Sequence, residues 1–128
     1  MYALAYAYSL FDQERKAMSV YKEMQDLDSS YSEAFCQMGQ IYQKKYNELD
    51  SALTMYREVI SIDPNHVDAY VNMGVIYEAQ QQNTNALKSY AKALVILPED
   101  RSPFMSLRDF SANQNLARVY ADELQKKL

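Results

Sequence analysis

Hydrophobic residues along most of the chain recur with the period of one α-helix face. Around Phe35, Met38 and Tyr42 they fall at positions i, i+3 and i+7. The chain has only two Gly and three Pro, which leaves few turns of the kind that joins strands. The pattern therefore predicts an all-α fold of long helices and short connections.

The periodicity and the candidate cap residues together predict where the helices begin and end. Pro64 and Pro98 end helices because proline cannot continue the backbone hydrogen-bond ladder. Ser30, Asn65 and Asn83 stand where N-caps are expected. The predicted helices are residues 1–11, 14–27, 31–44, 49–61, 66–80 and 83–96, with a break at 97–101.

Two blocks of the chain repeat the same residue order. Residues 32–66 contain Phe35, Met38, Gly39, Tyr42, Ala52, Tyr56, Val59 and Pro64, and residues 67–100 contain Tyr70, Met73, Gly74, Tyr77, Ala86, Tyr90, Ala93 and Pro98. The spacing from Gly to Ala is 13 in the first block and 12 in the second, so one additional residue belongs in the turn between helices, within residues 44–50. A degraded copy precedes them, with Leu4, Ala5, Tyr8, Ala17, Tyr21, Met24 and Ser29.

A Gly inside a helix costs about 1 kcal/mol relative to Ala. Gly39 and Gly74 are therefore best explained by a second helix that crosses too close to leave room for a Cβ. Ala52 and Tyr56 would supply the small and large surfaces of that crossing.

This order of residues resembles the tetratricopeptide repeat family from Met1 to about Asp100. The resemblance implies a solenoid of antiparallel helix hairpins, wound as a right-handed superhelix, whose first helices line a concave groove. We expect one domain over residues 1–128, with repeats at 1–31, 32–66 and 67–100 and a helical cap at 101–128.

The C-terminal part does not follow the repeat. Ser102 followed by Pro103 predicts a short helix that ends near Phe110. From Asn113 onward, apolar residues recur every four positions, which predicts a capping helix with one polar face. These residues are Leu116, Tyr120, Leu124 and Leu128.

Composition and charge narrow the function. A net charge of -4 lacks the basic stripe that nucleic-acid binding requires, so we expect no nucleic-acid partner. A single cysteine, Cys36, fits a reducing compartment, and the apolar segment from Met1 to Phe11 is too short for a membrane span and lacks a basic flank. We therefore predict a soluble cytoplasmic protein with no membrane partner.

Catalytic chemistry is not indicated. The chain has one His, one Cys and no glycine loop or metal-ligand spacing, so we predict no enzyme activity, no cofactor and no metal. His66 follows Pro64 and is interpreted as a solvated turn residue. Cys36 is interpreted as a small apolar residue rather than a reactive thiol.

The resemblance places the binding groove on the first helices. The predicted groove residues are Tyr2, Tyr6, Glu33, Cys36, Gln37, Gln40, Asp68, Val71, Asn72 and Val75. The Lys and Arg residues with which some family members grip C-terminal carboxylates are absent from these positions. Of the residues at the clamp places, only Asn72 suits an extended peptide backbone.

The predicted function is a protein-interaction scaffold or adaptor that binds a peptide or a partner helix. One alternative is an array that only stacks on neighbouring repeats, and another is a regulatory or targeting segment of a larger enzyme such as a protein glycosyltransferase. Ten of the residues from Met1 to Phe11 are apolar. We therefore expect this end to contact further repeats or a second copy of the chain.

Overall fold

The computed structural model describes residues 2–10, 13–27, 32–103 and 105–128, without the side chains of residues 8–10. Every regular element in these ranges is a helix: α1 (Tyr2–Leu10), α2 (Glu14–Leu27), α3 (Ser32–Lys44), α4 (Leu49–Ile62), α5 (Val67–Ala79), α6 (Asn83–Leu94), the 3-10 helix η1 (Pro98–Asp100) and α7 (Leu107–Lys127). The all-α prediction is confirmed. Met1, Phe11, Ser29, Ser30 and the Tyr8 side chain, on which some predictions depend, lie outside the described residues.

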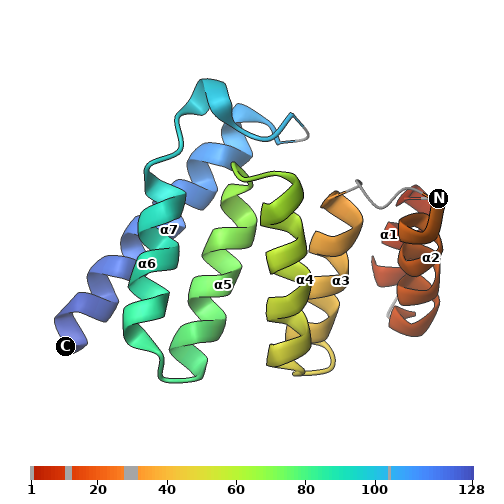
Figure 1. Ribbon diagram of the computed structural model, residues 1–128, viewed down its shortest axis with the longest axis horizontal. Helices are drawn as coiled ribbons and strands as arrows, with labels where there is room; N and C mark the ends of the chain where they lie inside the picture. The colour runs from red at the N-terminus through yellow and green to blue at the C-terminus, as the bar shows by residue number, and fades with distance from the viewer. Residues whose placement is uncertain (1, 11–12, 28–31, 104) are drawn as a thin grey trace. The chain divides into compact units, whose positions relative to one another are not determined.

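The chain divides into two compact units. Unit 1 is Met1–Ile62 and unit 2 is Asp63–Leu128. In unit 1, α1 pairs with α2 and α3 pairs with α4, each as an antiparallel hairpin (Figure 1). In unit 2, α5 and α6 form a third hairpin, and α7 packs against both of them (Figure 1).

Each unit is built around its own core of small and aromatic side chains. The buried core of unit 1 is Ala5, Ala17, Met18, Tyr21, Met24, Ala34, Met38 and Ile41. The buried core of unit 2 is Val67, Val71, Ala86, Tyr90, Ala93, Ile96, Phe110, Ala117 and Leu124. Many signature residues of the repeat, among them Ala17, Tyr21, Ala86 and Tyr90, therefore lie in the cores.

The two glycines mark close helix crossings, as the sequence predicted. A Cβ placed on Gly39 would lie 2.8 Å from Cε1 of Tyr56, and one on Gly74 would lie 2.7 Å from Cδ1 of Tyr90. Both rings are fully buried. In each hairpin, the tyrosine of the second helix therefore occupies the space that a side chain on the first helix would need.

The same two tyrosines also join the helices of their hairpins by hydrogen bonds. The Tyr56 hydroxyl donates to Oε1 of Gln43 at 2.9 Å, and the Tyr90 hydroxyl donates to Oε2 of Glu78. Gln43 and Glu78 each lie four residues after the glycine of their repeat. Burial, the hydrogen bond to Glu78 and the charge of Glu78 raise the pKa of Tyr90 well above its ordinary value.

The additional residue of the first complete repeat lies in the turn between helices, as predicted. The Glu48 N–H donates to the Tyr42 carbonyl at 2.8 Å, and the Gln82 N–H donates to the Tyr77 carbonyl at 2.8 Å. The first bond closes a turn that is one residue longer than the second. Asn47 adopts φ 52° in the longer turn, a left-handed conformation that asparagine tolerates.

The C-terminal prediction was wrong in two respects. No helix begins at Ser102, because α7 starts at Leu107 with Ser106 as its N-cap, whose Oγ accepts from the Asp109 N–H at 3.1 Å. This Ser-x-x-Asp arrangement is a capping-box pattern that was readable in the sequence. The two predicted helices are instead one helix.

The predicted apolar stripe of the cap was also partly misplaced. The residues of α7 that are buried are Phe110, Ala117 and Leu124, at a spacing of seven. Leu116 is 42% exposed and Leu128 is 71% exposed. Leu124 is buried and Tyr120 packs against the core of unit 2, so the stripe is right at its middle and wrong at its two ends. A repeat of four drifts around the helix, whereas a seven-residue spacing aligns more closely with two helical turns.

His66 is not the solvated turn residue that was predicted. Its side chain is 1% exposed, and Nδ1 accepts from the Ala69 N–H at 3.2 Å, so His66 is the N-cap of α5 in place of the expected Asn65. An imidazole nitrogen satisfies a helix-end donor as a hydroxyl or carboxylate oxygen does. Asn83 is the first residue of α6 and not its cap.

Candidate peptide-binding surfaces

The α1 candidates of unit 1 are two tyrosines one helical turn apart. The rings of Tyr2 and Tyr6 are stacked, with centroids 6.3 Å apart and planes 8° apart. The Tyr2 ring also meets the buried Tyr21 ring edge-on, with centroids 6.0 Å apart. Tyr6 is 45% exposed, so the pair presents an aromatic surface that the buried Tyr21 ring holds in place through Tyr2.

The α3 candidates differ in their exposure. Glu33, Gln37 and Gln40 are half-buried, whereas Cys36 is only 1% exposed. Nε2 of Gln40 donates to Sγ of Cys36 at 3.8 Å. Cys36 is thus a buried packing residue, whereas Glu33, Gln37 and Gln40 keep part of their polar surface exposed.

The remaining candidates lie on α5 in unit 2. Nδ2 of Asn72 donates to Oδ1 of Asp68 at 3.4 Å, and Val75 is half-buried one turn further on. Val71 is 3% exposed and belongs to the core of this unit. Asp68, Asn72 and Val75 are therefore the α5 candidates with surface to offer.

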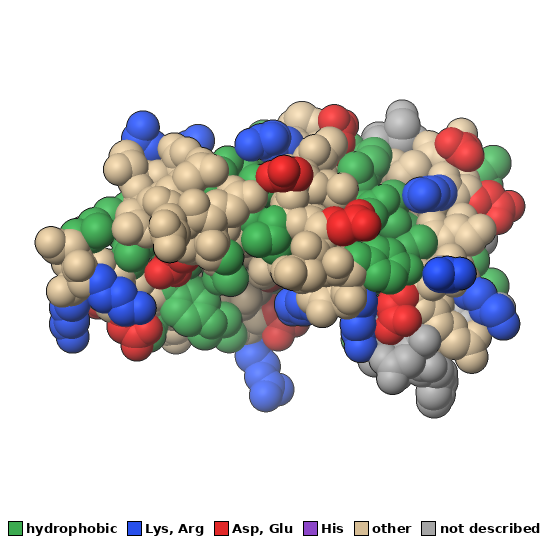
Figure 2. Space-filling model, turned by 90° about the horizontal axis from the view of Figure 1, so that it is seen from below, with side chains coloured by type: hydrophobic (Ala, Val, Ile, Leu, Met, Phe, Trp, Pro, Cys, Tyr) green, Lys and Arg blue, Asp and Glu red, His purple; other side chains and the backbone are tan. Residues whose placement is uncertain are grey.

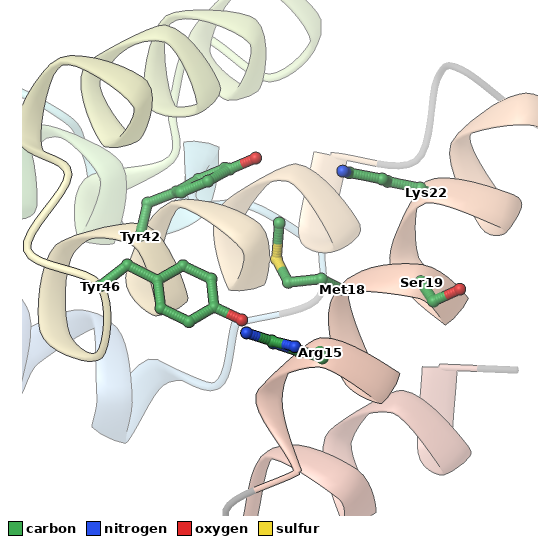
Figure 3. Close-up of a pocket in the computed structure, with 6 residues that line it drawn as sticks. All are labelled: Arg15, Met18, Ser19, Lys22, Tyr42 and Tyr46. Carbon is green, nitrogen blue, oxygen red and sulfur yellow. The ribbon is translucent and has the colours of Figure 1, made fainter.

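A recess between α2 and α3 was not predicted from the sequence. It has a volume of about 290 Å³ and is lined by Arg15, Met18, Ser19, Lys22, Tyr42 and Tyr46. Arg15 and Lys22 extend from α2 toward the two tyrosine rings, with Met18 between them, whereas the Ser19 hydroxyl points away (Figure 3). The signal available in the sequence was the seven-residue spacing of Arg15 and Lys22, which places them on one side of α2 with Met18 between them.

The described ranges contain neither a candidate metal-binding cluster nor a helix that could span a membrane. No group of three or more His, Cys, Asp or Glu side chains there could hold a metal ion. Within the same ranges, no helix combines the length and apolarity that crossing a membrane requires. Acidic, basic and hydrophobic side chains are interspersed on the face shown in Figure 2.

Comparisons with known proteins agree with the hairpin geometry. A TPR repeat model matches residues 46–81, and a tetratricopeptide repeat model matches residues 67–96. No curated protein is similar enough in sequence to count as a relative.

Two crystal structures of MamA are similar to the chain in fold. One has a TM-score of 0.68 and 30% identity over 73% of this chain and 50% of its own. The other has a TM-score of 0.69 and 19% identity over 98% of this chain and 75% of its own. The chain thus spans half the length of the first of these proteins.

Proposed function

Because the chain belongs to the tetratricopeptide repeat family, we propose that it is a non-catalytic scaffold or adaptor module that binds an extended peptide or a helix of a partner protein. The observation that carries this proposal is which side chains are buried and which remain at the surface of the first helices. Most repeat-signature side chains pack in the hairpin cores, while the first helices keep amides and tyrosines at the surface. Surfaces of this composition suit recognition more than chemistry.

In unit 1, we assign peptide contacts to the amides of Gln37 and Gln40 and to the ring of Tyr6. A side-chain amide both donates and accepts, so it can pair with the backbone of an extended segment. The Tyr6 ring, held by its stack on Tyr2, would cover apolar ligand surface at a small entropic cost. Asn72 is proposed to play the amide role on α5 of unit 2.

Peptide selection on the immobilised chain tests this proposal. The selected peptide should lose affinity for the Gln37→Ala, Gln40→Ala double variant by about tenfold, since two neutral hydrogen bonds contribute about 0.5–1.5 kcal/mol each. Its affinity should change little between low and high salt, because the contacts carry no net charge. Gln125→Ala, a change at an exposed position of α7, is the matched control. Equal affinity of the double variant and the wild type would refute the assignment.

We also propose that α1 makes a contact with a second copy of the chain or with further repeats. Leu4 is 50% exposed and Tyr6 is 45% exposed on this short apolar helix, which leaves hydrophobic surface in water. Light scattering over a range of concentrations should show a higher mass for the wild type than for Leu4→Glu. A wild-type chain that stays monomeric at high concentration would argue against self-association.

The regulatory or targeting role in a larger enzyme stays an alternative prediction. It would retain the same peptide-binding surfaces and add a catalytic part elsewhere. Cytoplasmic localisation likewise stays a prediction.

A further inference from the structure

The recess between α2 and α3 collects positive charge in a chain whose net charge is -4. Arg15 and Lys22 lie on its α2 side, and neither forms an ion pair or hydrogen bond with any residue that the structure describes. An adjoining recess of about 400 Å³ shares Arg15 and Tyr46 and adds Gln13, Glu14 and Lys16. The acid among these residues, Glu14, is paired with Lys45 at 3.5 Å. The two recesses therefore present a local excess of positive charge.

The other walls of the recess are apolar and aromatic. Met18 is 6% exposed and forms its floor. The Tyr42 and Tyr46 rings meet edge-on, with centroids 6.2 Å apart, and their hydroxyls point toward the Lys22 and Arg15 side chains respectively (Figure 3). A ligand that fits must combine negative charge with carbon-rich surface.

The longer turn after α3 places Tyr46 in the lining of the recess. Tyr46 lies in the turn that contains the additional residue. The hydrogen bond from the Glu48 N–H to the Tyr42 carbonyl closes this turn around it. The corresponding turn of the next hairpin, which closes at Gln82, is one residue shorter and has glutamines there. The recess is thus a local feature of this hairpin and does not follow from the repeat pattern.

We propose that this recess binds an acidic segment of a partner protein, with one carboxylate near Arg15, a second near Lys22, and an apolar side chain on Met18 and the tyrosine rings. Arg15 and Lys22 are separated along the helix by about 10 Å, at 1.5 Å per residue over seven residues. Acidic residues three apart in a segment of polyproline II conformation lie on one side of it and are separated by about 9 Å. A free phosphate would leave the apolar walls uncovered, and a flat membrane surface would not reach Met18 at the floor of the recess.

Fluorescence anisotropy with a defined peptide tests the proposal. The probe is a short labelled peptide with two Glu residues three apart and Leu between them, and its neutral counterpart carries Gln in both places. The full chain should bind the Glu peptide about tenfold or more tightly than the Gln peptide, because bonds to charged groups are the stronger ones. Raising the salt concentration should lower the affinity for the Glu peptide and leave that for the Gln peptide nearly unchanged.

Variants locate the binding. Arg15→Gln with Lys22→Gln should lose about tenfold or more in affinity. Lys88→Gln with Lys92→Gln makes the same charge change on exposed positions of α6 and should keep wild-type affinity. Tyr46→Ala should weaken binding without any change of charge. The helical circular dichroism of each variant confirms that it is folded.

Equal affinity for the Glu and Gln peptides would overturn the inference. So would an equal loss of affinity in the variant of Arg15 and Lys22 and in the variant of Lys88 and Lys92. A third overturning result is binding to anionic vesicles that depends on Arg15 and Lys22 when the Glu peptide does not bind. The Gln37→Ala, Gln40→Ala variant should bind the Glu peptide as the wild type does. The experiments therefore distinguish a wrong assignment of the recess from a wrong assignment of the α3 amide surface.

Discussion

The helix crossing at Gly74 offers a quantitative test of how the hairpin is held. In Gly74→Ala, the new Cβ would lie 2.7 Å from both Cδ1 and Cζ of Tyr90, whereas ordinary contacts begin at 3.4 Å. Cε1 of the ring would lie closer still, so the ring must move by more than about 0.7 Å inside a packed core, which costs about 2–3 kcal/mol, the upper part of the usual overpacking range. Alanine recovers about 1 kcal/mol through its greater helix propensity. The expected net loss of stability is about 1–2 kcal/mol.

Urea unfolding followed by circular dichroism measures this loss, and thermal unfolding should show a Tm lowered by about 3 to 10 °C. Gly39→Ala is the graded comparison, because its closest approach is 2.8 Å and its next ones are 3.0 and 3.1 Å, so it should cost less. Gly74→Leu should cost more than Gly74→Ala.

A double-mutant cycle attributes the effect to the ring itself. In a Tyr90→Leu background the ring is gone, so Gly74→Ala should become nearly neutral or stabilising. In a Tyr90→Phe background the ring remains and the penalty should persist. A Gly74→Ala protein as stable as the wild type would refute the close-crossing explanation.

Three further changes test other parts of the structure. Stability should fall as the pH rises above about 10, because Tyr90 then loses a proton in the unfolded chain but retains it in the folded one, where its pKa is raised. Urea midpoints at neutral and alkaline pH measure this fall, and Tyr90→Phe should reduce it. His66→Ala should cost about 1–2 kcal/mol in urea unfolding through loss of the α5 cap, and His66→Asn should recover part of it. Phe110→Ala should cost about 3–5 kcal/mol, whereas Leu116→Ala should cost about 1 kcal/mol or less, since Phe110 is buried and Leu116 is 42% exposed.

Each of these has a contradicting result. An alkaline fall in stability that is identical in Tyr90→Phe would assign the proton to other tyrosines. A neutral His66→Ala would show that the cap contributes nothing, and equal costs for Phe110→Ala and Leu116→Ala would restore the four-residue stripe that the sequence suggested.

The sequence alone was sufficient for the fold class, the hairpins and the close crossings. These features depend on local periodicity and on a glycine and a tyrosine that recur in two repeats, so a linear pattern contains the information. The bounds of α2 were predicted without error, and those of α3, α4, α5 and α6 to within two residues. The additional residue near Tyr46 was likewise placed correctly in its turn.

Only the tertiary structure decided which polar and apolar side chains are buried. His66 and Leu116 were both misassigned, because burial depends on what packs against a helix face and a periodicity argument does not contain that neighbour. The recess of Arg15, Lys22 and Tyr46 has the same origin. It is made by two helices and a lengthened turn that meet in space, and no single segment of the sequence contains all three.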